Sequence, residues 1–253
     1  MSATARKLAI VTGTTSGVGE AVAAALVERG WNVLGVARRE ATIDHTGYRH
    51  LRVDLSDLAS LTTAFESDVA PSLLRGDWAR IGLVNNAASP ELLLPIERMD
   101  ASELCTLFSI NTVAPMWCMG FVSRQAAKHV PLRVVNVSSA AAVRAFAGLG
   151  AYGSAKAALR MAGMILAEEW TSTVPHAPAR SDAAIMNYQP AAVDTPMQET
   201  ARSKSPREFP WVGMFTSMRD RGVLVQPRGP AAEIADFLDA DNVPAFSERR
   251  FGE

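Results

Sequence analysis

Two hydrophobic periods alternate along the chain. Short apolar runs typical of buried strands occupy residues 8–12, 32–37, 48–53, 81–84, 132–137 and 183–188. Stretches with helical spacing follow most of these runs, at residues 17–29, 58–65, 102–129, 151–170 and 230–238, before a weak final strand. Repeated strand–helix units with apolar strands predict an α/β fold, a doubly wound parallel sheet of about seven strands with helices on both faces.

The pattern breaks down between residues 190 and 228, where prolines and charged residues are frequent. An irregular connection of this length is uncommon unless it has a function, so we expect a substrate lid. Its large apolar residues either line a ligand pocket or pack the lid onto the core or a second subunit. They are Met197, Phe209, Trp211, Met214, Phe215 and Met218.

Composition limits the classes of partner. The 253 residues fit a single domain over 1–253, and 48% are apolar, enough for a substantial core. A formal net charge of −1, without a basic stripe, argues against nucleic acid or an anionic membrane as partner. The chain start lacks a secretory signal pattern, and no run of about 18 uninterrupted apolar residues predicts a membrane span. We therefore expect a cytoplasmic protein.

The cysteines and histidines do not suggest a disulfide or a metal site. Cys105 and Cys118 lie thirteen residues apart in one predicted helix, about 20 Å along its axis, too far to pair. We expect both to be reduced thiols. The four histidines are scattered, and no Cys/His spacing resembles a set of metal ligands.

A glycine cluster follows the first predicted strand and opens the first helix. Glycines permit a tight turn and a close backbone approach to a pyrophosphate, and the helix N-terminus favours its charge. The context predicts a dinucleotide site, with a plain turn as the alternative. The candidate binding residues are Gly13, Thr15, Ser16, Gly17, Val18 and Gly19.

The second predicted strand ends in a pair of arginines, Arg38 and Arg39, and no carboxylate occurs there before Glu40. An acidic residue at this point would bind the ribose hydroxyls of NAD. Two guanidinium groups instead suit the 2′-phosphate of NADP. We predict NADP(H) as the cofactor; the alternative is a solvated arginine pair in a turn.

The strongest chemical signal is Tyr152 with Lys156, four residues later on a predicted helix. Residues at this spacing share a helix face, and an ammonium group there is expected to lower the pKa of the phenol. Such a tyrosine can exchange a proton with a carbonyl or alcohol oxygen. The alternative is an ordinary surface contact on the helix.

Together these motifs resemble the short-chain dehydrogenase/reductase family. The resemblance rests on the glycine spacing G-x-x-x-G-x-G, the N-N-A-A stretch at 85–88, the helix asparagine at 111, the serine at 139 and the Y-x-x-x-K at 152–156. The run N-Y-Q-P-A-A-V-D-T-P-M-Q at 187–198 is similar to the sepiapterin reductase and benzil reductase-like branch. The resemblance implies a Rossmann-type sheet and a catalytic group of Asn111, Ser139, Tyr152 and Lys156.

The resemblance also implies a role for each of these positions. Ser139 would stabilise the oxyanion on the substrate, and Asn111 would hold a water that links Lys156 to solvent. Besides Tyr152 and Lys156, the implied cofactor contacts are Asp54 and Leu55 at the adenine, Asn86, Ala87 and Ala88 after the fourth strand, and Pro190, Val193 and Thr195 at the nicotinamide. Two positions depart from the family pattern, since Ala88 and Ala191 stand where it has glycine.

We therefore expect an NADPH-dependent reductase that converts a small-molecule carbonyl, a ketone or diketone, to an alcohol. One alternative is a 3-oxoacyl thioester reductase, for which Arg124, Lys128 and Arg133 would form a basic surface for a carrier protein. Another is a non-catalytic NADP(H)-sensing protein. Small residues on the predicted helix 151–170, including Ala155, Ala162 and Gly163, would form the family's dimer face with helix 102–129. A homodimer is expected, with a tetramer as the alternative.

Overall fold

A computed structural model describes residues 6–74 and 77–253 of the protein. Within this part of the chain, seven strands form one parallel sheet in the order β3-β2-β1-β4-β5-β6-β7, which confirms the predicted doubly wound fold. The strands are β1 (Lys7–Thr12), β2 (Trp31–Ala37), β3 (Tyr48–Arg52), β4 (Arg80–Asn85), β5 (Leu132–Val137), β6 (Ala183–Gln189) and β7 (Phe246–Arg250).

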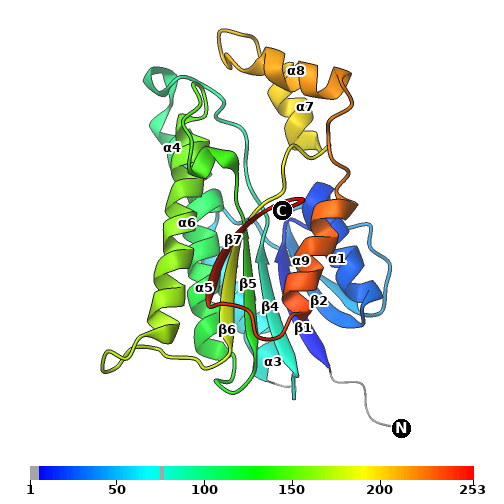
Figure 1. The fold of residues 1–253 in the computed structure, drawn as a ribbon, viewed down its shortest axis with the longest axis vertical. Coiled ribbons are helices and arrows are strands. Elements are labelled where there is room, and N and C mark those ends of the chain that lie inside the picture. The colour runs from blue at the N-terminus through cyan, green and yellow to red at the C-terminus, as the bar shows by residue number, and fades with distance from the viewer. Residues whose placement is uncertain (1–5, 75–76) are drawn as a thin grey trace.

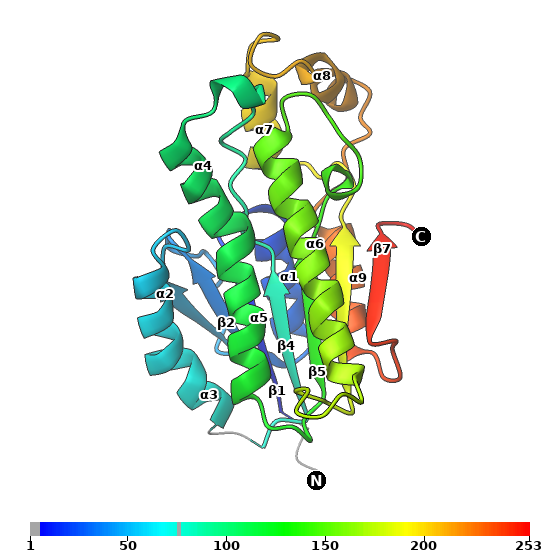
Figure 2. The ribbon, with the colours of Figure 1, turned by 90° about the vertical axis from the view of Figure 1, so that its left-hand side faces the viewer.

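Helices cover both faces of this sheet (Figure 1). One face carries α1 (Gly17–Glu28) and α9 (Arg228–Asp239), which pack against each other. The other carries three longer helical segments, which Figure 2 shows in front of the strands. They are α2–η1–α3 (Leu58–Ala64, Phe65–Val69, Ala70–Leu74), α4–η3–α5 (Ala101–Phe108, Ser109–Val113, Ala114–Gln125) and α6 (Gly150–Thr171).

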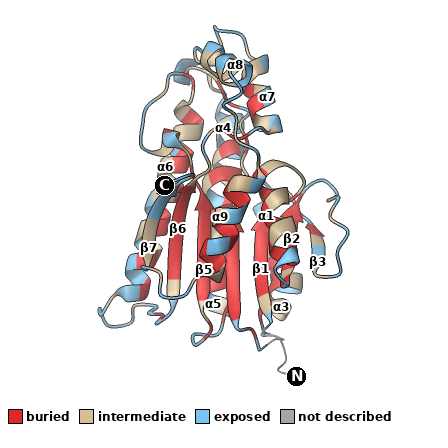
Figure 3. Ribbon diagram, turned by 45° about the vertical axis from the view of Figure 1, so that its right-hand side comes forward, coloured by how far each residue is buried: buried red, intermediate tan, exposed pale blue. Residues whose placement is uncertain are grey.

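Each face of the sheet has its own hydrophobic core. Side chains alternate along β1, so that Leu8 and Ile10 join the core under α5 and α6, whereas Ala9 and Val11 join the core under α1 and α9. The central strands are buried on both faces, as Figure 3 shows in red. This double burial explains why their sequences read as continuous apolar runs.

The predicted helix at 102–129 contains a π-helical turn, η3, and ends at Gln125. Pro115 lies in the first turn of α5 and carries no N–H, so the α-helical bond to the carbonyl of Asn111 cannot form. The irregular turn therefore lies one turn before the proline, and it contains Asn111. Such π-turns inside α-helices are frequent at functional sites.

By length and composition alone, the helix Ala101–Gln125 could cross a membrane, with a mean hydropathy of 1.4. However, 56% of that apolar window is buried inside the protein. Cys118, Phe121 and Val122 face the sheet in the core beneath α5. Packing in the fold thus accounts for the apolar character of this helix.

The two cysteines are free thiols in different surroundings, Cys105 exposed on α4 and Cys118 buried on α5. Burial raises the pKa of the Cys118 thiol well above its usual range. Within residues 6–74 and 77–253, no three His, Cys, Asp or Glu side chains gather where they could hold a metal ion.

The segment predicted to be irregular at 190–228 is partly helical, so that expectation was wrong. It contains α7 (Pro196–Ser203) and α8 (Val212–Asp220), which project beyond the carboxyl ends of the strands (Figure 1). The remaining short turns are η2 (Ile96–Arg98) and η4 (Ala140–Ala142).

Candidate active site

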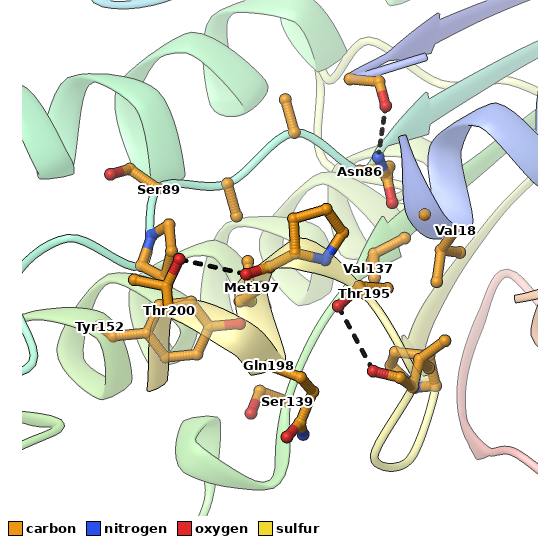
Figure 4. A pocket seen from close by; sticks show the side chains of 18 of the residues that line it. Val18, Asn86, Ser89, Val137, Ser139, Tyr152, Thr195, Met197, Gln198 and Thr200 are labelled. Atoms are coloured by element: carbon orange, nitrogen blue, oxygen red, sulfur yellow. Dashed lines mark hydrogen bonds between the residues drawn. The ribbon is translucent and has the colours of Figure 1, made fainter. Parts of the chain in front are cut away.

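A cavity of about 630 Å³ is lined by residues that follow the carboxyl ends of the strands and by residues of α7 and α8. This edge of a parallel α/β sheet is where such folds bind ligands. Figure 4 shows some of the side chains that line the cavity. All of the sequence-predicted site residues line it except Gly19 and Asn111.

The glycines of the turn after β1 serve different purposes. Gly13 (φ +76°) and Gly17 (φ +62°) adopt left-handed backbone conformations, which L-residues rarely adopt. A Cβ on Gly13 would lie 2.8 Å from Asn86 Nδ2, and one on Gly17 would lie 2.9 Å from Thr195 Cγ2. A Cβ on Gly19 would lie 2.2 Å from the carbonyl oxygen of Gly13, so Gly19 allows α1 to pack against the turn and does not face the cavity.

Thr12 and Asn86 fix the glycine turn through hydrogen bonds. Asn86 Nδ2 donates to the carbonyl oxygens of Thr12 (3.0 Å) and Gly13 (3.2 Å). In return, the Thr12 hydroxyl accepts the backbone N–H groups of Asn86 and Ala87, both at 3.0 Å. These hydrogen bonds connect the end of β1 to the end of β4. Thr12 takes part in most of them, although the sequence did not mark it as a site residue.

The two arginines after β2 border the glycine turn. Arg39 Nη2 lies 3.2 Å from the Thr15 hydroxyl and 3.3 Å from the Ser16 hydroxyl, and donates to both. Arg38 lies beside Asp54, with Nη1 3.8 Å from Oδ2. Both arginines line the cavity, so a cation and two hydroxyls stand together at its edge.

Ser139 follows β5, Tyr152 and Lys156 lie near the start of α6, and all three line the cavity. Lys156 is 2% exposed, its Nζ donates to the carbonyl oxygen of Val137 at 2.7 Å, and it lies 5.8 Å from the centre of the Tyr152 ring. The Ser139 hydroxyl accepts the N–H of Ala141 at 3.2 Å.

The electrostatics of this group differ from the sequence-based expectation. Burial raises the pKa of Tyr152 to about 12, and a hydrogen bond with Ser139 opposes that rise. Burial also lowers the pKa of Lys156 to about 8. The expectation of a lowered phenol pKa was wrong because burial has the largest effect on the pKa of Tyr152, and the hydrogen bond with Ser139 only partly offsets it.

Asn111 is fully buried and does not reach the cavity. Its Oδ1 accepts the N–H of Ser89 at 2.8 Å, and its Nδ2 donates to the carbonyl oxygen of Ser89 at 3.0 Å. The side chain therefore fixes the segment that follows Ala87 and Ala88, both of which line the cavity. Sequence reasoning found the residue but not this partner.

The loop after β6 closes another wall of the cavity with Pro190, Val193 and Thr195. Val193 is buried and pairs with Val225, and the Thr195 hydroxyl donates to the Val193 carbonyl at 3.3 Å. Ala191 has φ +63°, the left-handed conformation that the family pattern assigns to glycine.

Comparison with known proteins agrees with this geometry. The model of the family described as short chain dehydrogenase matches residues 7–206. The chain belongs to the short-chain dehydrogenase family. Among its relatives is a benzil reductase ((S)-benzoin forming) from Bacillus cereus, 29% identical over 252 residues that cover 96% of this chain and 98% of that protein.

Two further relatives span almost the whole chain. Sepiapterin reductase from Xenopus tropicalis is 27% identical, covering 92% of this chain and 92% of the relative. The solved structure of a short-chain dehydrogenase/reductase from Saccharomyces cerevisiae superposes with a TM-score of 0.81 at 25% identity, over 98% of this chain and 96% of that one. The predicted family and branch are thus confirmed.

The apolar residues of the region 190–228 divide between two roles in this short-chain dehydrogenase. Phe209 is fully buried and packs with Leu93 and Ala201. Met214 and Met218 line the cavity, as do Phe209 and Phe215. Both readings of these residues therefore hold in part, since Phe209 packs with Leu93 and also lines the cavity, together with Met214, Phe215 and Met218.

Proposed function

We propose that the protein is an NADPH-dependent carbonyl reductase that reduces a ketone or a diketone to an alcohol. The observation that carries the proposal is the meeting of Ser139, Tyr152 and Lys156 in one cavity with the glycine turn and its arginines. An oxidoreductase of this family needs its catalytic side chains and its cofactor-binding turn beside the same substrate. Gly13 and Gly17 line the cavity, and the turn that they form at the N-terminus of α1 suits the cofactor's pyrophosphate.

In this mechanism the bound NADPH supplies the hydride that adds to the carbonyl carbon. The Ser139 hydroxyl donates a hydrogen bond to the carbonyl oxygen and stabilises the negative charge that develops there. The Tyr152 hydroxyl then gives its proton to that oxygen, which completes the alcohol. Lys156, held by the Val137 carbonyl, keeps a positive charge near the tyrosinate that forms.

The raised pKa of Tyr152 supports the reductive direction. A phenol with a pKa of about 12 is protonated at neutral pH and so is ready to act as a general acid. Oxidation of an alcohol would instead require the phenolate at the start of the reaction.

The surroundings of the arginines support NADPH over NADH. Arg39 already bridges Thr15 and Ser16, and a 2′-phosphate is the anion that such a set of donors recognises. Asp54, the nearby carboxylate that could bind ribose hydroxyls, accepts instead from the N–H and hydroxyl of Ser56 at 2.9 and 2.7 Å.

We also infer a homodimer, although its basis differs from the predicted one. Ala155, Ala162 and Gly163 are buried inside the subunit, so the small residues do not form an exposed face. Large apolar side chains on these two helices are instead half or more exposed, Met116 on α5 and Met161 on α6. A second copy would cover this face, and light scattering of the purified protein tests the inference.

The experiment that tests the function is NADPH consumption with 1,2-diketones, quinones, pterins and 3-oxoacyl thioesters, using Tyr152→Phe as the control. We expect diketone turnover that the variant loses. Turnover of thioesters alone would favour the carrier-linked reductase, although buried Arg133 cannot belong to its basic surface. Tight NADPH binding with no turnover would favour the sensing protein and contradict the proposal.

A further inference from the structure

One buried polar side chain at the cavity has an amide oxygen without a hydrogen-bond partner in the described part of the chain. Gln198, in the first turn of α7, is 8% exposed and lines the cavity (Figure 4). Its Oε1 is shielded from solvent and has no hydrogen-bond partner among the residues that the structure describes. A buried carbonyl oxygen without a donor is costly, so such groups normally have a partner or a function.

A structural role for Gln198 is suggested by its position, because Thr195 and Gln198 have the spacing of a capping box. In that motif the Gln side chain would accept the backbone N–H of the helix N-cap residue. Here only the backbone N–H of Gln198 is engaged, donating to the Thr195 carbonyl at 2.9 Å. The side-chain oxygen of Gln198, which would complete the capping box, accepts no hydrogen bond from Thr195.

Neighbouring polar groups at the cavity contrast with Gln198. On the same helix, the Thr200 hydroxyl donates to the Pro196 carbonyl at 3.1 Å. Asn86 and Lys156 likewise have protein partners. Gln198 thus differs from these cavity residues in keeping a hydrogen-bonding atom available.

We propose that Gln198 is a specificity-determining residue, which binds an oxygen substituent on the carbon next to the reacting carbonyl. The inference rests on the proposed function. A substrate whose carbonyl oxygen faces Ser139 and Tyr152 is covered by α7, the helix that carries Gln198. A side-chain amide suits either form of such a substituent, because Oε1 accepts from a hydroxyl and Nε2 donates to a second carbonyl. Apolar walls that include Met214 and Phe215 would enclose the rest of the molecule.

The test uses three ketones on one carbon skeleton, which differ only at the neighbouring carbon. Benzil carries a second carbonyl there, benzoin a hydroxyl and deoxybenzoin a methylene group. The kcat/KM for each is measured with the wild-type protein and with Gln198→Met, which keeps the length of the side chain and removes the amide. The matched control is Thr200→Val, whose hydroxyl is already paired within α7.

We expect Gln198→Met to lower kcat/KM for benzil and benzoin about tenfold, the value of one lost hydrogen bond. For deoxybenzoin the same variant should keep or raise kcat/KM, because it removes an amide that this substrate leaves unpaired. Thr200→Val should change all three values in the same proportion.

Three results would overturn the inference. One is an equal loss on all three ketones, and another is a weaker affinity for NADPH in place of a change in substrate preference. The third is a loss of thermal stability in Gln198→Met beyond that of Thr200→Val, which would assign the amide to the fold. If wild-type protein reduces none of the ketones, the proposed function itself fails; if it reduces them and the substrate preference is unchanged in the variant, only the role of Gln198 fails.

Discussion

Ala191 offers a direct test of how this family's glycine position tolerates a side chain. Its φ of +63° lies in the left-handed region, which costs an L-residue about 1–2 kcal/mol. Ala191→Gly removes that strain but adds freedom to the unfolded chain, worth about 0.5–1 kcal/mol. Because the side chain is exposed, little packing is lost. We expect a net gain of about 0.5–1 kcal/mol in the free energy of unfolding.

The gain can be measured by urea unfolding and as a rise in Tm of roughly 2 °C for a chain of this size. Ala192→Gly is the matched control, since Ala192 is the next residue and does not have a positive φ. There no strain is relieved, and the entropic cost alone should lower the free energy of unfolding by about 0.5–1 kcal/mol. The free energy of unfolding should therefore rise in Ala191→Gly and fall in Ala192→Gly, both with and without NADPH. A shift of the same sign in both would refute the strain argument.

Three further predictions concern the site. The kcat/KM for reduction should fall as the pH rises through about 8, where Lys156 loses its proton, while Tyr152 stays protonated to about 12; a flat profile across pH 8 would contradict these assignments. Asn111→Ala should lower the free energy of unfolding by about 1–3 kcal/mol and reduce kcat, because the backbone N–H and carbonyl of Ser89 both lose their hydrogen-bond partner. A free energy of unfolding in urea equal to that of the wild-type protein would refute this. Arg39→Ala should raise KM for NADPH about tenfold or more and leave KM for NADH nearly unchanged; steady-state kinetics with equal effects on both would exclude a phosphate contact.

Most of the fold could be predicted from the sequence because the pattern of apolar residues matches the positions that the fold buries. The strand predicted at 132–137 matches β5, whose six residues are all buried, the polar Arg133 and Asn136 included, as expected of a strand covered on both faces. The Tyr152–Lys156 pair was equally clear, since four residues along a helix bring two side chains to one face. The glycine turn was found for the same reason, as its conformations are local.

The parts that were missed depend on distant partners. Nothing near Asn111 in the sequence indicates that its amide binds Ser89, twenty-two residues away. The helix α7 does carry local start signals, Thr195 followed by Pro196, but the residues that it buries are Gln198 and Ala201, so no apolar stripe marks it as a helix in the sequence. The pKa of Tyr152 could not be predicted either, because its direction is set by desolvation, which only the packed site defines.

The residues that position this site are mostly not those that line it. The Thr12 hydroxyl connects the start of the glycine turn to the backbone after β4, and Asn111, buried in η3, fixes the backbone that follows Ala88. Both side chains hydrogen-bond within the protein, so they hold the cavity walls and do not line the cavity themselves. Gln198 is the reverse case, a cavity residue whose amide oxygen is unpaired among the described residues. A side chain that is hydrogen-bonded within the protein supports the fold, whereas an unpaired one in the cavity is free to bind a ligand. Substitutions at Asn111 should therefore change stability more than substrate preference, and substitutions at Gln198 should change substrate preference more than stability.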